Sequence, residues 1–228
     1  MADLRLETQL GAHVDRFGNA ARTRRWRFSD ISRTGLDLSG FFMKFATTSP
    51  NVYLESCKDS EGREIQGTTS PVAGGGICIT CSFDKVLPPN ASYSVEVSYR
   101  HNRYFRYLSK TGVWFLNEWF ARSGPLDNPG CSQEEPQRLR FELTIDDARG
   151  RLPGRLVKTF EWDADPPPDT FDKQSTTLRL CWERNLRPDD KTEDIIVAYR
   201  VGWIIDKLGP LIRWFLPFLP KPGYHLGG

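Results

Sequence analysis

Two cysteines in this sequence have a spacing that binds metal or exchanges disulfides in other proteins. Cys78 and Cys81 form a C-x-x-C pair, as in zinc ribbons and thioredoxin-like redox sites. The pair falls inside an alternating apolar run, and residues three apart on a strand face opposite sides of the sheet. No second Cys or His pair follows in the sequence. We therefore expect two packed thiols, with no zinc site and no redox site.

An aspartate-rich loop offers a second metal-binding pattern. Asp163, Asp165 and Asp169 crowd one proline-rich stretch, and calcium binds carboxylate oxygens at such density. A complete calcium site also takes ligands from another loop, for which Asp146 and Asp147 are candidates. An acidic loop in solvent explains the same residues, so we expect no cofactor and keep calcium as the alternative.

The histidines do not indicate a catalytic site. His13, His101 and His225 are scattered, and none has a neighbour that would complete a ligand pair or a triad. The sequence has no serine-hydrolase elbow, zinc-protease, phosphate-loop or dinucleotide motif. We therefore expect a protein that acts by binding. A hydrolase whose site forms only in three dimensions is the enzymatic alternative.

Arginines and aromatic rings interleave in residues 99–107, and a second arginine cluster surrounds Trp26. Single-stranded nucleic acid is bound by this combination, because guanidinium groups meet phosphates and flat rings stack on bases. In a strand, however, both faces of residues 99–107 would be mixed, so no clean stacking surface results. Nucleic-acid binding is the alternative function. Its candidate phosphate-binding residues are Arg22, Arg24, Arg25, Arg100, Arg103 and Arg106.

The most apolar stretch of the sequence is residues 201–219, VGWIIDKLGPLIRWFLPFL. A membrane-spanning helix needs about 20 apolar residues, but prolines and three charges interrupt this stretch. We expect an amphipathic helix over 201–220 that docks on a protein partner, a second copy or a membrane surface, or that covers the protein's own sheets. The docking side chains would be Trp203, Ile204, Ile205, Leu208, Leu211, Ile212, Trp214, Phe215, Leu216, Phe218 and Leu219.

The sequence ends in Gly227 and Gly228, and this terminus resembles that of ubiquitin-like modifiers. The resemblance covers only the last residues. It implies a β-grasp body with a helix after the first hairpin, and no segment of this sequence has that helical pattern. A modifier role is therefore a further alternative to a flexible tail over 221–228.

These candidate residues must be positioned mainly by β-strands. Apolar residues alternate with polar ones in run after run, and turn-forming clusters separate the runs at sandwich-like spacings. The alternating apolar residues are Trp26, Phe28, Phe41, Met43, Phe45, Val52, Leu54, Ile77, Ile79, Cys81, Phe83, Tyr93, Val95, Val97, Tyr99, Leu139, Phe141, Leu143, Ile145, Leu178, Leu180 and Trp182. The pattern predicts an all-β, mainly antiparallel β-sandwich.

An offset of one hundred residues aligns several positions of the sequence, among them Cys81 with Cys181 and Val97 with Val197. This indicates two tandem related units, or else one larger sandwich. The expected division is an N-terminal arm (1–20), a first unit (21–110), a linker with a short aromatic helix (111–137), a second unit (138–200), the apolar helix (201–220) and the tail.

Composition sets the remaining expectations. The 228 residues are 39% hydrophobic with a net charge of +2, so the sequence suffices for a core and its overall charge selects no partner. The N-terminus does not resemble a secretory signal, and five cysteines are an odd number, which favours reduced thiols. We expect a cytoplasmic binding or assembly protein, or one at the periphery of a membrane.

Overall fold

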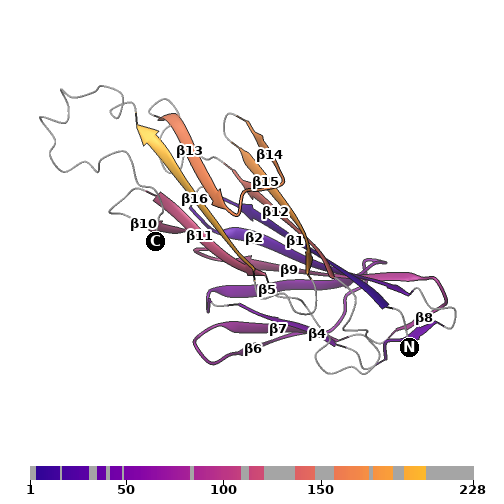
Figure 1. The fold of residues 1–228 in the computed structure, drawn as a ribbon. Helices are drawn as coiled ribbons and strands as arrows, with labels where there is room; N and C mark the ends of the chain where they lie inside the picture. The colour runs from indigo at the N-terminus through magenta and orange to yellow at the C-terminus, as the bar shows by residue number, and fades with distance from the viewer. Residues whose placement is uncertain are drawn as a thin grey trace, which may run out of the picture.

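The computed structural model describes residues 4–15, 17–30, 35–39, 42–47, 49–82, 85–108, 113–120, 137–146, 157–174, 177–186 and 193–203. Within these ranges the chain forms sixteen strands in four sheets and no helix (Figure 1). The prediction of a β protein with mainly antiparallel sheets is confirmed for this part of the chain.

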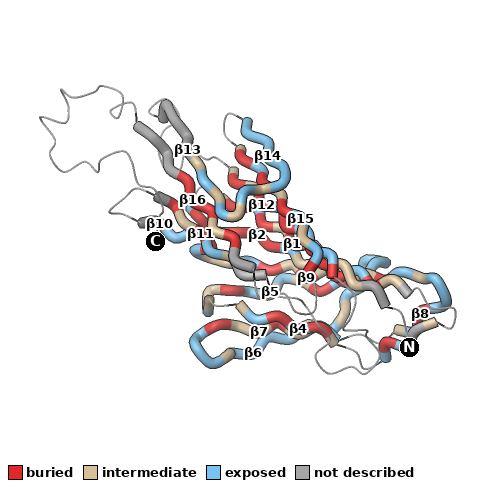
Figure 2. The backbone as a smooth tube through the Cα atoms, in the orientation of Figure 1, coloured by how far each residue is buried: buried red, intermediate tan, exposed pale blue. Residues whose placement is uncertain are grey.

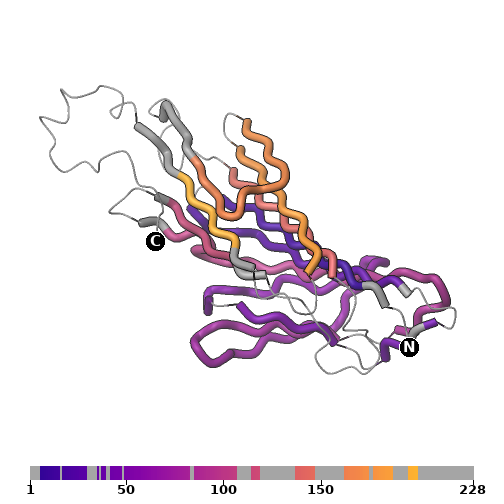
Figure 3. The backbone as a smooth tube through the Cα atoms, in the orientation of Figure 1, coloured from indigo at the N-terminus to yellow at the C-terminus, as the bar shows by residue number. Residues whose placement is uncertain are grey.

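The largest sheet has seven strands in the order β14-β15-β12-β1-β2-β9-β5. Every neighbouring pair is antiparallel except β1 and β12, which run parallel, so the sheet is mixed. That parallel pair joins the first strand of the chain to a strand from its second half, as Figure 3 shows. The strands are β1 (Leu4–Val14), β2 (Ala20–Asp30), β5 (Val52–Asp59), β9 (Ser92–His101), β12 (Gln137–Ile145), β14 (Thr170–Lys173) and β15 (Leu178–Leu186).

Three smaller sheets accompany it. A four-stranded sheet has the order β10-β11-β16-β13, a three-stranded sheet the order β4-β7-β6, and β3 pairs with β8. All of their pairings are antiparallel. The strands are β3 (Leu36–Asp37), β4 (Phe42–Ala46), β6 (Gly67–Pro71), β7 (Ile77–Ser82), β8 (Val86–Leu87), β10 (Arg106–Leu108), β11 (Val113–Phe120), β13 (Val157–Asp165) and β16 (Glu193–Trp203).

Buried side chains form two separate hydrophobic cores. Figure 2 colours the backbone of the buried residues red, and these positions recur along the strands. The first core lies between the seven-stranded and four-stranded sheets, and includes the stacked rings of Phe141 and Trp182. The second core lies between the seven-stranded and three-stranded sheets, and includes Trp26 and Ile79. Most of the residues that the alternation marked as apolar faces are buried in one of these cores, because successive side chains on a strand point to opposite faces.

Two expected divisions of the chain are wrong. Residues 1–20 are not an arm, because β1 lies in the middle of the seven-stranded sheet with Leu10, Ala12 and Val14 in the first core. Thr8 and Gly11 dilute the apolar pattern of this strand, which explains the wrong prediction. In the expected linker 111–137, Val113–Phe120 forms strand β11 and no aromatic helix.

The offset of one hundred residues does not match equivalent strands. Val97 lies on β9 of the seven-stranded sheet, whereas Val197 lies on β16 of the four-stranded sheet. Cys81 lies on β7 and Cys181 on β15, which again belong to different sheets. Internal duplication therefore stays a prediction.

The apolar segment 201–220 lies almost wholly outside the described residues. Its first three residues continue β16, which ends at Trp203 and pairs there with Val157 of β13. The tail 221–228 also lies outside. Within the described ranges, no helix has the length and hydrophobicity that a membrane crossing requires.

Candidate functional site

The border between the two cores on the inner face of the seven-stranded sheet is polar. β2 places Arg22 and Arg24 there, two residues apart and therefore on the same face. In the sheet register, Arg22 lies beside Tyr99 of β9, and Arg24 lies beside Val97. We call the group Arg22, Arg24, Tyr99, His101, Tyr104 and Glu118 the arginine seam.

Arg22 is held by a complete ion pair. Its two terminal nitrogens donate to the two carboxylate oxygens of Glu118 at 2.8 and 3.0 Å, and only 4% of the residue is exposed. The guanidinium also lies 4.5 Å from the ring centroid of Tyr104. Burial alone would lower the pKa of Arg22, but the nearby carboxylate holds that pKa above its ordinary value. Arg22 is therefore charged and fixes β2 to β11.

Arg24 lacks such a partner among the described carboxylates. Its guanidinium lies 4.2 Å from the ring centroid of Phe45 and 6.0 Å from that of Trp26. Burial, and then the positive charge of Arg22, lower the pKa of Arg24. Burial, and then Arg22, also lower the pKa of His101 to about 4, so this imidazole is neutral near pH 7. The described part of the seam thus has two cations for one carboxylate.

Several buried polar atoms around the seam have no hydrogen-bond partner within the described protein: Thr8 Oγ1, Arg22 Nε, Arg24 Nε, Trp26 Nε1 and His101 Nδ1. Buried polar atoms are normally paired with protein or with ordered water. Most of these atoms are donors, and they accompany an excess of positive charge. Chemically, the seam is suited to water molecules or to a small anion.

The outer face of the seven-stranded sheet carries arginines in a different state. Arg25 donates to Glu96 at 3.0 Å, and Arg100 donates to Glu55 at 2.9 Å, both exposed to solvent. A hollow of about 160 Å³ on this face is lined by Gln9, Leu10, Gly11, Thr23, Arg25, Glu96, Arg140 and Glu142. The missing side chain of Gly11 opens it, since a Cβ there would lie 2.6 Å from Thr23 Oγ1. Its charges are of both signs and are paired, so it favours no anion.

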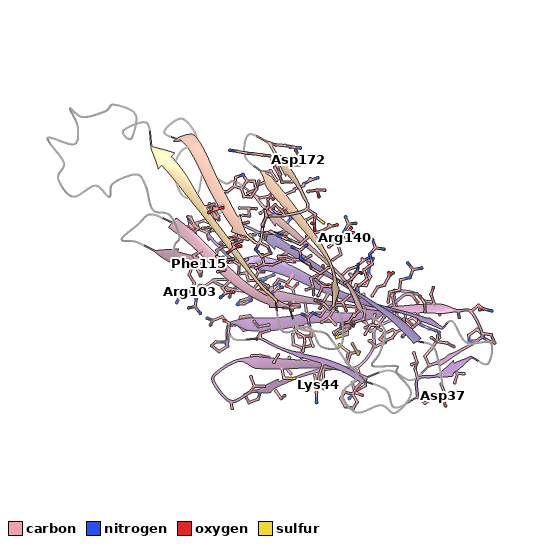
Figure 4. The ribbon with its side chains drawn as sticks, viewed as in Figure 1. Asp37, Lys44, Arg103, Phe115, Arg140 and Asp172 are labelled. Carbon is pink, nitrogen blue, oxygen red and sulfur yellow. The ribbon has the colours of Figure 1, made fainter. Side chains whose placement is uncertain are left out.

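The six arginines predicted to bind phosphate do not form one surface. Arg22 and Arg24 face inward on β2, and Arg25 and Arg100 face outward. Arg103 and Arg106 are exposed on and after the turn that follows β9. Figure 4 shows Arg103 well away from Arg140, which belongs to the outer-face group. The arginines around Trp26 are neighbours in the sequence, but successive side chains of β2 point to opposite faces of the sheet, so the cluster is divided between the two faces.

The aspartate loop is placed in part. Asp163 and Asp165 are exposed near the end of β13. Asp169 accepts hydrogen bonds from the backbone N–H of Glu183 and from Arg184 Nη1, at 2.6 and 2.9 Å. The described residues contain no group of three or more side chains that could hold a metal ion. The described residues therefore do not bring together the set of carboxylates that a calcium site needs.

The C-x-x-C pair is divided between the two faces of β7, as expected. Cys81 is fully buried in the second core, whereas Cys78 is half-buried with its sulfur 4.0 Å from Thr80 Oγ1. The close neighbour of Cys81 is instead Cys57 of β5, whose sulfur is 2.9 Å away. Sequence reasoning missed this pair because β5 has a register shift between Leu54 and Ser56, which moves the inward positions from even to odd numbers.

Comparisons with known proteins do not identify the chain. No protein-family model matches it, and no curated protein matches its sequence. Among solved structures, it is similar to an M1 zinc metallopeptidase from Deinococcus radiodurans at 10% identity and a TM-score of 0.43, covering 86% of this chain and 42% of that one. It is also similar to native yeast LTA4 hydrolase at 9% identity and a TM-score of 0.46, covering 88% and 29%. The chain spans less than half the length of either protein, and likeness at this level carries no argument.

Proposed function

We propose that this chain is a non-catalytic binding or assembly protein that docks on another protein chain through residues 203–219. In this proposal the described strands form a rigid double β-sandwich, and an amphipathic helix follows β16 after Trp203. Docking buries the bulky side chains of that helix, each contributing roughly 1.5–3 kcal/mol when fully removed from water.

The observation that carries the proposal is that each hydrophobic core is built by two facing sheets. Each draws its large side chains from two facing sheets, so the seven-stranded sheet and both smaller partners already have apolar inner faces in contact. In our proposal, the bulky residues from Ile204 to Leu219 pack on the surface of another protein chain. Internal duplication belongs to the same proposal, and strands from both halves of the chain lie in the seven-stranded sheet.

The distribution of charge favours a protein, and not a lipid surface, as the partner of residues 203–219. An anionic membrane attracts clusters of unpaired cations next to the inserted helix. On the outer face of the seven-stranded sheet, Arg25, Arg100 and Arg140 are each paired with glutamate. These three arginines therefore offer phospholipid no unpaired positive charge.

The test compares the full chain with two variants by light scattering after size exclusion, by pull-down with the full chain as bait, and by flotation with anionic vesicles. One variant ends after Trp203, which keeps all of β16, and the other carries Trp214→Ala, Phe215→Ala and Phe218→Ala. Docking on protein predicts complexes that both variants lose while their circular dichroism is unchanged. If the full chain floats with the vesicles and both variants do not, the segment docks on a lipid surface and the proposal of a protein partner is wrong. Identical behaviour of all three chains would reject docking through this segment.

One specific observation favours a second function, the binding of a small oxyanion such as phosphate or sulfate at Arg24. Arg24 has no described carboxylate partner, and its own Nε and the Nε1 of the neighbouring Trp26 are buried donors without a partner in the described protein. A bound anion would balance the charge of the seam and stabilise the folded state by mass action.

Thermal unfolding in sodium phosphate, sodium sulfate and sodium chloride at equal ionic strength tests this function. We expect the unfolding midpoint to rise with phosphate or sulfate concentration in the parent chain and not in Arg24→Met. Arg25→Met, on the outer face, is the matched control and should keep the response. Equal responses in all three chains would assign the effect to general salt stabilisation.

A further inference from the structure

The sulfur atoms of Cys57 and Cys81 lie 2.9 Å apart in the second core. Cys57 belongs to β5, an edge strand of the seven-stranded sheet, and Cys81 belongs to β7, the central strand of the three-stranded sheet. The two residues are 3% and 0% exposed. A disulfide requires about 2.05 Å between its sulfurs, so forming the bond takes a movement of less than about 1 Å.

Both cysteines are positioned by regular strand pairing. Cys57 lies opposite Val97 of β9, and Cys81 lies between Met43 of β4 and Gly67 of β6. Gly67 also makes the contact possible, because a Cβ at that position would lie 2.4 Å from the sulfur of Cys57. The space around the two sulfurs is therefore part of the fold.

The two thiols differ in acidity. The hydrogen bond between the two sulfurs lowers the pKa of Cys57, whereas the same contact and burial raise the pKa of Cys81. A thiolate is the nucleophile in thiol–disulfide exchange. Cys57, on edge strand β5, is accordingly assigned as the attacking thiol once local opening of that edge admits the small disulfide, and Cys81 as the resolving thiol.

We propose that Cys57 and Cys81 form a disulfide that links the seven-stranded sheet to the three-stranded sheet when the chain meets an oxidising pool of small disulfides. The Cys57 thiolate attacks one sulfur of the small disulfide, breaks its S–S bond and releases one small thiol. Cys81 then loses its proton and attacks the mixed disulfide at Cys57, releasing the second small thiol. Two protein thiols are oxidised by two electrons, and one small disulfide is reduced to two thiols.

This bond changes an expectation drawn from the sequence. An odd cysteine count favoured reduced thiols, and the C-x-x-C spacing drew attention to Cys78. The geometry instead pairs Cys81 with a residue 24 positions earlier, and leaves Cys78 on the other face of β7 beside Thr80. Cys181, on β15, lies in another part of the seven-stranded sheet. Cys131 lies outside the described residues.

The experiment uses the full chain, purified in reducing buffer and then equilibrated in oxidised and reduced glutathione. Free thiols are blocked, and tryptic peptides are analysed by mass spectrometry. We expect a mass decrease of about 2 Da before blocking, from the two hydrogens lost. Residues 45–58 and 64–85 should be joined. Because Cys78 and Cys81 share the second peptide, the Cys78→Ser variant is analysed in parallel and should give the same linkage.

Thermal unfolding of the oxidised and reduced forms of this one sequence then tests the link between sheets. We expect the oxidised form to unfold roughly 5–10 °C higher, from the typical stabilisation by a disulfide in a chain of this size. Cys81→Ser should lose the joined peptides and the difference in midpoint. Glutathione adducts without the joined peptides would overturn the proposal, as would a disulfide made by Cys78. A Cys57–Cys81 bond with no rise in midpoint would overturn its role as a link between the sheets.

Discussion

The four-stranded and three-stranded sheets pack on the same face of the seven-stranded sheet, but different chemistry crosses the two contacts. At the border of the first core, Arg22 of β2 forms a bidentate ion pair with Glu118 of β11. In the second core, the sulfur of Cys57 on β5 meets that of Cys81 on β7. A buried ion pair must be kept whole, because either partner alone is an uncompensated charge, whereas a thiol pair stays neutral whether or not it is bonded. The first contact is therefore the more sensitive to substitution, and the second is the more sensitive to redox conditions.

The largest effect should come from breaking the ion pair. Glu118→Ala leaves the Arg22 guanidinium buried without its carboxylate, and we expect a loss of about 3–5 kcal/mol in unfolding free energy, measured by urea denaturation. The double variant Arg22→Met, Glu118→Leu removes both charges and should lose much less. If the single and double variants were equally destabilised, packing and not charge would be the cause.

The second-largest effect should come from acid, which lowers the unfolding free energy through His101 of the arginine seam. The folded-state pKa of His101 is about 4 against an ordinary value of 6.5, so the unfolded chain binds the proton more readily. The stability due to this residue is present above pH 6.5 and is lost as pH falls toward 4, by up to about 3 kcal/mol. Arg22, Arg106 and Glu118 are the charges that act on the imidazole.

His101→Gln should remove this part of the pH dependence. Unfolding free energies of the parent and the variant are compared at pH 7.5, 6.0, 5.0 and 4.5. An identical slope in both proteins would assign the acid sensitivity to carboxylates alone.

A smaller loss of stability should follow from a substitution at Gly67, which lies against the sulfur of Cys57. Gly67→Ala places a methyl group on the sulfur of Cys57 and next to Leu54, and we expect a loss of about 1–3 kcal/mol in reducing buffer. In a Cys57→Ala background, the nearest obstacle, the sulfur, is gone and only the contact with Leu54 remains tight, so the added methyl group should cost less. Additive losses in this double-mutant cycle would show that Gly67 and Cys57 are independent.

The smallest effect should come from the outer face. Arg25 and Glu96 form an ion pair with side chains 51% and 35% exposed, so water screens the pair. Arg25→Ala should cost about 0.2–1 kcal/mol, less at high salt. The same denaturation assay used for Glu118→Ala measures it. A loss as large as that of Glu118→Ala would remove the distinction between inner and outer arginines of β2.

Sequence patterns predicted the strands better than their partners. Alternation located the faces of β9, β12 and β15, and it separated Cys78 from Cys81 correctly. It failed at β1, where small and polar residues interrupt the pattern, and at β11, where Phe115 and Trp119 make both faces apolar in sequence. It also failed in β5, where a register shift reverses the inward positions.

The candidate site was predicted only in part. Arg22 and Arg24 were named as phosphate-binding residues from their clustering, but their inward direction and the partner Glu118 were not. Glu118 lies 96 residues from Arg22 in the sequence, and no local pattern connects them. His101 appeared as an isolated histidine, because its neutral state depends on burial beside Arg22.

The sequence by itself determined that the chain forms strands and which side of most strands is apolar, since period-two alternation is a local property of the backbone. Only the tertiary structure decided that two cores share one sheet, that Arg22 meets Glu118, and that Cys57 meets Cys81. These contacts depend on which strands pair and in what register, and burial of whole faces selects that pairing through residues far apart in the chain.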